Sequence, residues 1–198
     1  LYQAAGHYGM DTDWLLYRLT GQWLMDHSTA TTFHLQDQAS RTYHEPFLRR
    51  LEIPPRKLST LVPSGMAVGP LTASALVDTG LSPQTIVVTG CFDHPAAARS
   101  VGVLEPGQLM LSCGTSWVGF TPCMDRQVIV DAQMLCDPFL AADGGPWGGI
   151  FSVTAIGQTI DWYVNNVIAP GESDPMRIYN DAAAQAAPGA NGLTLDLR

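Results

Sequence analysis

Asp93 is the residue of this sequence whose position most strongly suggests chemistry. It follows a short β-branched run, residues 85–89, and precedes an alanine-rich stretch, residues 96–101. Ligands of open α/β folds bind beyond the carboxyl ends of the strands, and a helix N-terminus there favours an ionised carboxylate. Such a carboxylate can accept a proton from a substrate hydroxyl. The structural alternative, that Asp93 only caps the next helix with Pro95 in its first turn, is the commoner role of such an aspartate.

A second candidate is the tripeptide Gly114-Thr115-Ser116, which lies between two strand-like runs, residues 108–112 and 117–120. At the tip of a β-hairpin, backbone amides and two hydroxyls can bind a phosphate as an anion. An ordinary polar turn has the same composition, and three residues alone favour that simpler interpretation.

Two glycine features suggest close contacts. Residues 143–149 form a predicted glycine-rich loop that would allow close approach of a ligand, but it matches neither the Rossmann fingerprint nor the lysine-containing Walker A loop. Gly157 lies inside a strongly periodic helical pattern, where glycine costs about 1 kcal/mol relative to alanine. We therefore expect another helix or the flat face of a ligand next to Gly157, and packing is the simpler explanation.

Other catalytic patterns are missing from the sequence. There is no H-E-x-x-H motif, and Cys91 with His94 forms a single C-x-x-H without a second pair, so a zinc site is not favoured. The tripeptide at Gly114 lacks the second glycine of a nucleophile elbow, which argues against a hydrolase. The four cysteines contain no C-x-x-C pair, and we expect reduced thiols.

Composition bounds the class of protein. The 198 residues are 46% hydrophobic and 14% charged with a net charge of −8, which predicts a folded, acidic protein of one domain or two small halves sharing a cleft. Without a basic run, nucleic acid is not an expected partner. No stretch is long and apolar enough for a membrane span or a signal peptide, so we expect no membrane partner and a cytoplasmic location.

The elements that must position these residues follow from periodicity and turn residues. Helices are expected at Asp11–Thr20 (ended by Gly21), 45–51, 71–79 (ended by Gly80), 152–167 and 174–187. Residues 85–89 are expected to form a strand buried on both faces, and the β-branched residues 128–130 suggest another. A domain boundary is expected near Glu105. Both chain ends look cut from something longer, and residues 193–197 alternate like a strand.

Taken in order, several segments resemble the FGGY carbohydrate kinases of the actin-like, ribonuclease H-like ATPase superfamily. The matching segments, which cover nearly the whole chain, are Asp13-Trp14-Leu15-Leu16-Tyr17-Arg18-Leu19-Thr20-Gly21, Asp26 with Ser28-Thr29-Ala30, residues 61–69, Thr79-Gly80-Leu81, Gly90-Cys91-Phe92-Asp93-His94-Pro95-Ala96-Ala97, Gly114-Thr115-Ser116, residues 157–162 and Gly189-Ala190-Asn191-Gly192-Leu193. The ordered set is far more specific than any one motif.

The resemblance implies an α/β, actin-like ATPase fold, with parts of two domains flanking a cleft. Residues 1–105 would be the C-terminal part of the sugar-binding N-terminal domain, and residues 106–198 the first part of the nucleotide-binding domain. It also implies ATP, Mg²⁺ and a sugar or polyol as partners, with the metal ligands left unassigned and a homodimer kept open.

The resemblance also implies a role for each candidate residue. Asp93 matches the general base that accepts the proton of the attacking hydroxyl, and His94 beside it would contact the acceptor. The second phosphate-binding hairpin matches Gly114-Thr115-Ser116, while Gly157 and Asp161 align with positions lining the nucleotide site in the glycerol kinase branch. In phosphoryl transfer, positioning and charge stabilisation do most of the work, so closure of the two lobes would be part of the mechanism.

Two departures from the family pattern matter. The N-terminal D-x-G-T phosphate hairpin does not occur, since residues 143–145 lack its threonine, so we expect an internal portion of a longer kinase, inactive alone. The alternative is a non-catalytic sugar- or nucleotide-binding regulator on the same fold. His94-Pro95 also differs from the small or polar residues expected after the base, which leaves the particular sugar open.

Overall fold

The computed structural model describes residues 3–194, which divide into two compact units. Unit 1 is made from the chain up to Leu109 and from Phe120–Ile150, and unit 2 from Met110–Gly119 and the chain from Phe151 onward. The division does not test the domain boundary expected near Glu105, which stays a prediction.

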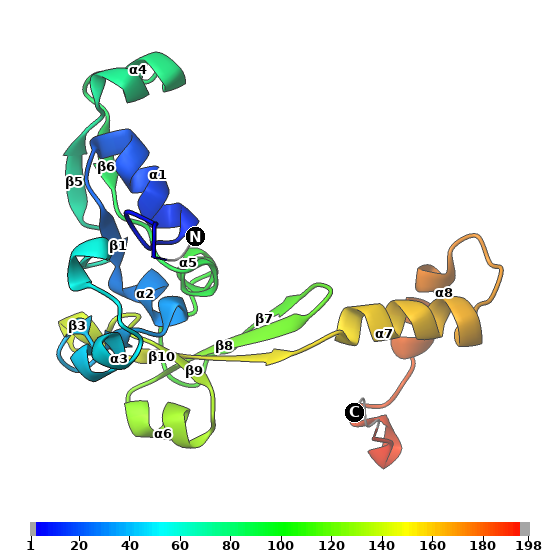
Figure 1. Cartoon of the computed structure of the whole chain (residues 1–198). Coiled ribbons are helices and arrows are strands. Elements are labelled where there is room, and N and C mark those ends of the chain that lie inside the picture. Colours follow the sequence, from blue (N-terminus) through cyan, green and yellow to red (C-terminus); the bar gives the residue numbers. More distant parts are fainter. Residues whose placement is uncertain (1–2, 195–198) are drawn as a thin grey trace. The chain divides into compact units, whose positions relative to one another are not determined.

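The first part of unit 1 alternates short helices and strands (Figure 1). Its elements are α1 (Asp11–Thr20), β1 (Leu24–Asp26), α2 (His27–Phe33), β2 (Gln36–Asp37), β3 (Thr42–Tyr43), α3 (Glu45–Arg50), the 3-10 turn η1 (Pro55–Lys57), β4 (Thr60–Val62), β5 (Ala67–Pro70), α4 (Ala73–Thr79), β6 (Ile86–Val88) and α5 (Asp93–Ser100). Helices α1 and α4 end as the sequence predicts, at Gly21 and Gly80 in the left-handed conformation that glycine adopts most easily.

The remaining elements include two strands that begin in one unit and end in the other. They are β7 (Met110–Cys113), β8 (Trp117–Cys123), α6 (Arg126–Asp131), β9 (Leu135–Asp137), the 3-10 turn η2 (Ala141–Asp143), β10 (Trp147–Val153), α7 (Ile156–Tyr163), the π-helical turn η3 (Val164–Ile168), α8 (Pro175–Ala183) and the 3-10 turn η4 (Ala190–Gly192). A helix is found where one was expected at 174–187, but α8 ends earlier, at Ala183. Its N-cap Asp174 accepts a hydrogen bond from the Arg177 amide.

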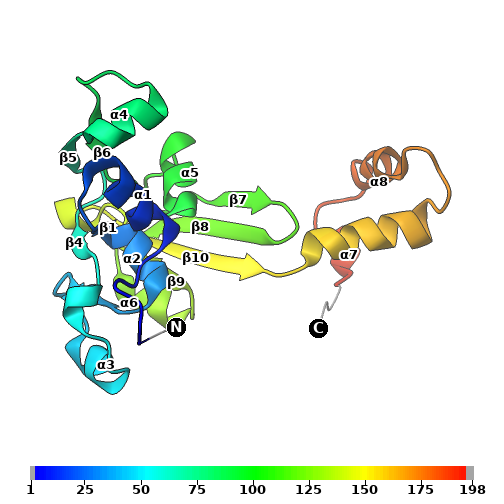
Figure 2. The same cartoon turned by 45° about the horizontal axis from the view of Figure 1, so that its top comes forward.

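Most strand pairs join consecutive strands, whereas β1–β4 and β8–β10 do not. The parallel pair β1–β4 aligns Leu24 with Thr60, the pairs β2–β3 and β5–β6 are antiparallel, and the largest sheet has the order β7-β8-β10-β9. Figure 2 shows β7, β8 and β10 side by side. Parallel pairing of β1 and β4 brings their carboxyl ends to one edge, where ligands of α/β folds bind.

The main core of unit 1 is a cluster of aliphatic side chains beneath α1 and α4. Its buried members are Leu16, Leu24, Val62, Leu71, Ala75 and Val87. Strand β6 contributes only Val87, because Ile86 and Val88 are 54% and 55% exposed. The expectation that residues 85–89 are buried on both faces is therefore wrong: β6 belongs to a two-stranded sheet, and only one of its faces packs on this cluster.

Two further expectations about local structure are wrong. Residues 128–130 lie in helix α6, because Asp125 accepts the Gln127 amide as an N-cap and a helical turn buries Ile129 alone. The expected glycine-rich loop ends early, and residues 147–149 already belong to β10. There Gly148 packs against the Phe120 ring, which lies 2.5 Å from where a Cβ would stand, so this glycine serves packing.

The helix expected at 152–167 begins later, at Ile156, because residues 152–153 still belong to β10 and Ala155 turns the chain with a φ of 59°. Of the strand-like residues 193–197, those after 194 lie outside the described residues. Among the described residues, no helix is long and apolar enough to cross a membrane.

Candidate active site

Asp93 stands at the first position of α5, five residues after β6 ends. Its side chain is 76% exposed, and its Oδ1 accepts the His94 backbone N–H at 2.7 Å. The His94 ring is 22% exposed, with Nε2 at 4.0 Å from the same oxygen. The Asp93 carboxylate thus projects into solvent from the positive end of a helix.

The capping alternative for Asp93 is wrong. The N-cap of α5 is Phe92, and no side chain caps it. The Phe92 backbone N–H instead donates to Ser28 Oγ at 3.1 Å, so a residue from α2 holds the start of α5. Asp93 is therefore not needed to begin its helix and is available to a ligand.

Ser28 connects this helix start to a buried carboxylate. Its hydroxyl donates to Asp137 Oδ2 at 2.6 Å, while the Phe139 backbone N–H donates to Asp137 Oδ1 at 2.8 Å. Both side chains are buried, with Asp137 0% and Ser28 1% exposed. Asp26 completes the cluster by accepting the Ser28 and Thr29 amides, each at 3.0 Å, at the N-terminus of α2.

Burial raises the pKa of Asp137 to about 6, although hydrogen bonds from Ser28 and Phe139 oppose the rise. The Arg99 guanidinium also lowers this pKa, whereas Asp26 raises it. A buried carboxyl that titrates near neutral pH is uncommon outside functional sites and ion-pair networks. The sequence contains no local sign of this cluster, because Ser28 and Asp137 are 109 residues apart.

A cavity of about 540 Å³ lies within unit 1 at the edge where β1, β4 and β6 end. It is lined by residues that follow each strand, among them His27, Ser64, Gly90 and Cys91, with Arg99 from α5. Asp93 is not one of its described lining residues. Gly90 and Cys91, which lead into the helix that carries Asp93, do line it.

His27 gives this cavity a polar atom that is not used in a hydrogen bond within the described residues. Its buried Nδ1 has no hydrogen-bond partner among the described residues, and neither have the two buried polar atoms of the Gln36 amide. Burial and the Arg41 guanidinium lower the pKa of His27, against smaller opposing effects of Asp26 and Gln36. A neutral imidazole can exchange hydrogen bonds with a ligand hydroxyl.

In unit 2, the tripeptide Gly114-Thr115-Ser116 forms the bend between β7 and β8, as the sequence predicts. The Gly114 N–H donates to the Ser116 carbonyl at 3.3 Å across the bend, and the Thr115 side chain is exposed. The Thr115 carbonyl accepts the Gly157 N–H at 3.0 Å, which joins the bend to the first turn of α7.

Gly157 is explained by this contact. A Cβ at position 157 would stand 2.2 Å from the Gly114 carbonyl oxygen and 3.1 Å from Thr115 Cα. The close neighbour is therefore the backbone of the bend, neither a second helix nor a ligand. Asp161 is exposed one helical turn after Gly157, so the two residues share a face of α7.

The predicted site residues thus gather in two places. Asp93 and His94 are adjacent in unit 1, and in unit 2 Gly157 lies directly against the bend at Gly114-Thr115-Ser116, with Asp161 on the same face of α7. Within residues 3–194, no three or more His, Cys, Asp or Glu side chains gather into a possible metal site.

Comparison with known proteins supplies the family of this arrangement. Residues 1–100 match the model of the N-terminal domain of the FGGY family of carbohydrate kinases. The chain is 30% identical to a ribulokinase from Geobacillus thermodenitrificans, over 92% of this chain and 34% of that protein. It is 27% identical to an autoinducer-2 kinase from Yersinia enterocolitica, over 98% of this chain and 37% of that protein. The chain therefore spans little more than a third of these relatives.

Solved structures agree on the fold. A xylulose kinase from Rhodospirillum rubrum superposes with a TM-score of 0.83 at 23% identity, covering 98% of this chain and 39% of that one. A glycerol kinase from Plasmodium falciparum, solved with ADP, gives a TM-score of 0.71 at 16% identity, covering 84% of this chain and 33% of that one. The α/β, actin-like ATPase fold expected from the sequence is confirmed.

Proposed function

This chain belongs to the FGGY family of carbohydrate kinases, and we propose that the protein containing it transfers the γ-phosphoryl group of ATP to a hydroxyl of a sugar or polyol. The observation that carries the proposal is Asp93: an exposed carboxylate at the first position of a helix that follows a strand, outside the N-cap. Ribulokinase, xylulose kinase and glycerol kinase among its relatives and structural neighbours support an acceptor of this class.

Asp93 acts as the general base in this proposal. Its Oδ1 already accepts the His94 N–H, so we assign Oδ2 to the proton of the attacking hydroxyl. His94 would give the acceptor a second polar contact beside the base. The cavity that His27 lines would hold further hydroxyl groups of the acceptor, because its Nδ1 has no partner among the described residues.

The nucleotide phosphates are assigned to unit 2. The exposed Thr115 side chain and the Ser116 hydroxyl lie at a bend whose backbone is fixed by α7, and such a bend can bind anionic oxygens. Gly157 and Asp161 would line the nucleotide site beside it. Mg²⁺ bound to ATP would neutralise phosphate charge, and a cytoplasmic location fits ATP as the donor.

The test uses the complete polypeptide that contains this chain. ADP release from Mg-ATP is measured against pentoses, hexoses, ketoses and polyols, with Asp93→Asn in parallel. We expect one acceptor class to stimulate ADP release, and Asp93→Asn to lower kcat by about 10²- to 10⁴-fold because the base is lost, with acceptor binding retained.

The matched control is Asp131→Asn, the same change at an exposed aspartate of α6 whose carboxylate accepts the Gln127 side chain. It should leave kcat unchanged. Near-normal turnover of Asp93→Asn would reject the proposed base. If no acceptor stimulates ADP release while ATP or a sugar still binds, the protein is a non-catalytic regulator on this fold.

A further inference from the structure

A chain of buried hydrogen bonds, which we call the relay, runs from Asp137 through Ser28 to the backbone of Phe92 at the start of the helix that carries Asp93. On the premise that Asp93 is the base, we propose that Ser28 and Asp137 are positioning residues, which fix the start of α5 and thereby the direction of the Asp93 carboxylate. Neither residue touches the acceptor in this proposal. Both act through the backbone N–H of Phe92, which directly precedes Asp93.

The direction of each hydrogen bond is fixed by chemistry. A backbone N–H can only donate, so the Ser28 oxygen must accept from Phe92. The single hydroxyl proton of Ser28 is then free for one acceptor, which is Asp137 Oδ2 at 2.6 Å. The second oxygen of Asp137 accepts the Phe139 N–H. When Asp137 is ionised and can only accept, each member of the relay therefore has a single hydrogen-bond arrangement.

Ser28 is itself held rigidly, so it can transmit position. Its backbone N–H donates to Asp26 Oδ1, an oxygen that also accepts the Thr29 N–H and the Ser64 hydroxyl, the latter at 2.9 Å. The relay therefore connects the ends of β1 and β9 with the start of α5. A displacement of about 1 Å in a catalytic group can cost about a hundredfold in rate, so a contact one residue from the base matters.

The other end of α5 is attached to the same segment as Asp137. The Arg99 guanidinium donates to the Phe139 carbonyl at 3.0 Å and lies 4.4 Å from the Phe139 ring centre. Residues 137–139 thus contact α5 through Arg99 directly and through Ser28 at its start. With both contacts made, the helix has little freedom to tilt.

The titration of Asp137 makes the proposal testable by pH. The charged or titratable groups that influence Asp137 are Asp26 at the end of β1, Arg99 on α5, Cys91 before α5 and Cys136 in β9. With its pKa raised to about 6 by burial, Asp137 binds a proton in mildly acidic solution. With a proton on Oδ2, Asp137 donates to the second lone pair of Ser28 Oγ, and the serine proton must turn to another acceptor. This changes the hydrogen-bond geometry that holds the start of α5.

The experiment measures kcat and KM from pH 5 to 8 in the complete polypeptide, with the acceptor found above. Asp137→Asn keeps the side-chain volume but replaces one acceptor oxygen with a donor, and Ser28→Ala removes the hydroxyl. For each variant we expect kcat to fall about tenfold or more with the KM for ATP unchanged. The fall in wild-type kcat below pH about 6 should disappear in both.

Coupling between the two positions separates positioning from simple damage. Because both residues act through one relay, the double variant should lose no more activity than the more affected single variant. The controls are Asp131→Asn and Ser100→Ala, the latter removing an exposed hydroxyl at the other end of α5 that donates to the Ala97 carbonyl. Neither control should change kcat or its pH profile.

The outcomes separate this inference from the proposed function. If Asp93→Asn is inactive while Asp137→Asn keeps the wild-type kcat and acid limb, the positioning role is wrong and the base assignment stands. If Asp93→Asn keeps near-normal turnover, the assignment of the base falls, and with it the premise of this inference. A relay variant whose activity is lost only together with its folded structure, as followed by thermal unfolding, counts against positioning and makes the pair merely structural.

Discussion

The two groups of candidate residues are held in place by different means. Around Asp93, unit 1 uses side chains: a buried serine and a buried carboxylate fix the start of α5. Around Gly157, unit 2 uses backbone: the carbonyl of Thr115 accepts the Gly157 N–H, and the absence of a Cβ permits the approach. A relay of polar side chains depends on charge and pH, whereas a backbone contact depends on shape.

This contrast has a chemical consequence. Phe92 lacks the short polar side chain that begins most helices, so α5 takes its support from α2 and β9. The bend at Gly114 is supported by helix α7 of its own unit. We therefore expect isosteric polar substitutions to disturb the first region and added methyl groups to disturb the second.

The largest expected effect on stability is the pH dependence of Asp137→Asn. Folding raises the pKa of Asp137 from 3.8 to about 6, so its stabilising contribution is complete below about pH 4 and is lost as the pH rises through 6. Relative to wild type, Asp137→Asn should therefore gain up to about 3 kcal/mol between pH 3.5 and 7. Thermal midpoints of both proteins across this range measure the difference, and a constant difference would contradict the raised pKa.

Gly157→Ala tests whether the backbone contact in unit 2 depends on shape. Alanine improves helix propensity by about 1 kcal/mol, but its Cβ would meet the Gly114 carbonyl oxygen, a backbone atom that cannot rotate away. We expect a net loss of about 2 kcal/mol, independent of pH, together with a raised KM for ATP.

The control for that change is Gly6→Ala, where a Cβ would have no heavy atom within 4 Å. Its thermal midpoint should match wild type. A stabilised Gly157→Ala would show that the bend moves away from α7 without cost, and the shape-based account of unit 2 would be wrong.

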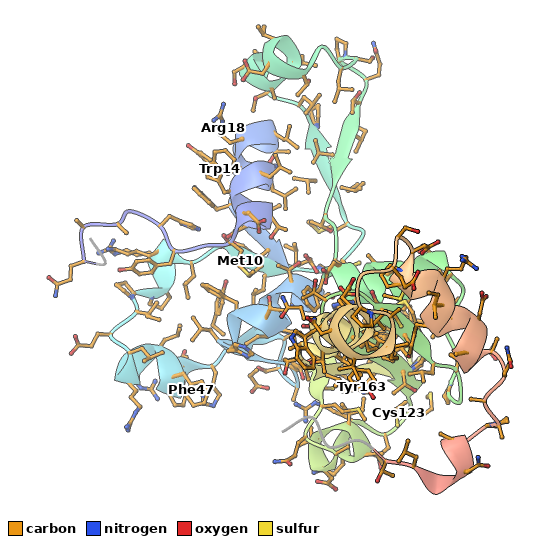
Figure 3. All side chains as sticks on the ribbon, turned by 90° about the vertical axis from the view of Figure 1, so that its right-hand side faces the viewer. Met10, Trp14, Arg18, Phe47, Cys123 and Tyr163 are labelled. Carbon is orange, nitrogen blue, oxygen red and sulfur yellow. The ribbon has the colours of Figure 1, made fainter. Side chains whose placement is uncertain are left out.

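The smallest effect is expected at the surface of unit 1. Figure 3 shows Trp14 and Arg18 on the same side of α1, where the Arg18 guanidinium lies 5.5 Å from the Trp14 ring centre. Arg18 also pairs with Asp78 at 3.5 Å, with both side chains more than half exposed. Asp78→Asn should change stability by under about 1 kcal/mol, and less in high salt. The thermal midpoints of both proteins across a salt titration measure this change. A larger loss of stability would mean that exposed charges matter as much as the buried relay.

Sequence predicted best what is decided locally. The helix Asp11–Thr20 and its end at Gly21 follow from periodicity and a glycine stop, and Gly114-Thr115-Ser116 lies at its predicted bend. Residues 128–130 failed because β-branched preference is weaker than a capped turn that buries Ile129. Gly148 looked like part of a loop, although the Phe120 ring, a distant neighbour in sequence, requires a glycine in a strand.

At the candidate site, sequence could place Asp93 at a strand–helix junction but not identify what holds it. The capping interpretation failed because the true partner of the helix start, Ser28, is 64 residues away. Asp137 was not predicted, since an aspartate at the end of a short strand has no local pattern that distinguishes it. The roles of Ser28 and Asp137 depend on burial and on long-range hydrogen bonds, which only the folded structure reveals.

The separation of 109 residues between Ser28 and Asp137 also sets an order of events during synthesis. At roughly 5–20 residues per second, the ribosome releases Asp137 some 5–20 seconds after Ser28. During that interval Asp93 and its helix are synthesised, before the carboxylate that completes their support. The nascent chain can therefore begin folding around Ser28 well before the orientation of Asp93 is fixed, and premature termination before residue 137 would leave that orientation unset.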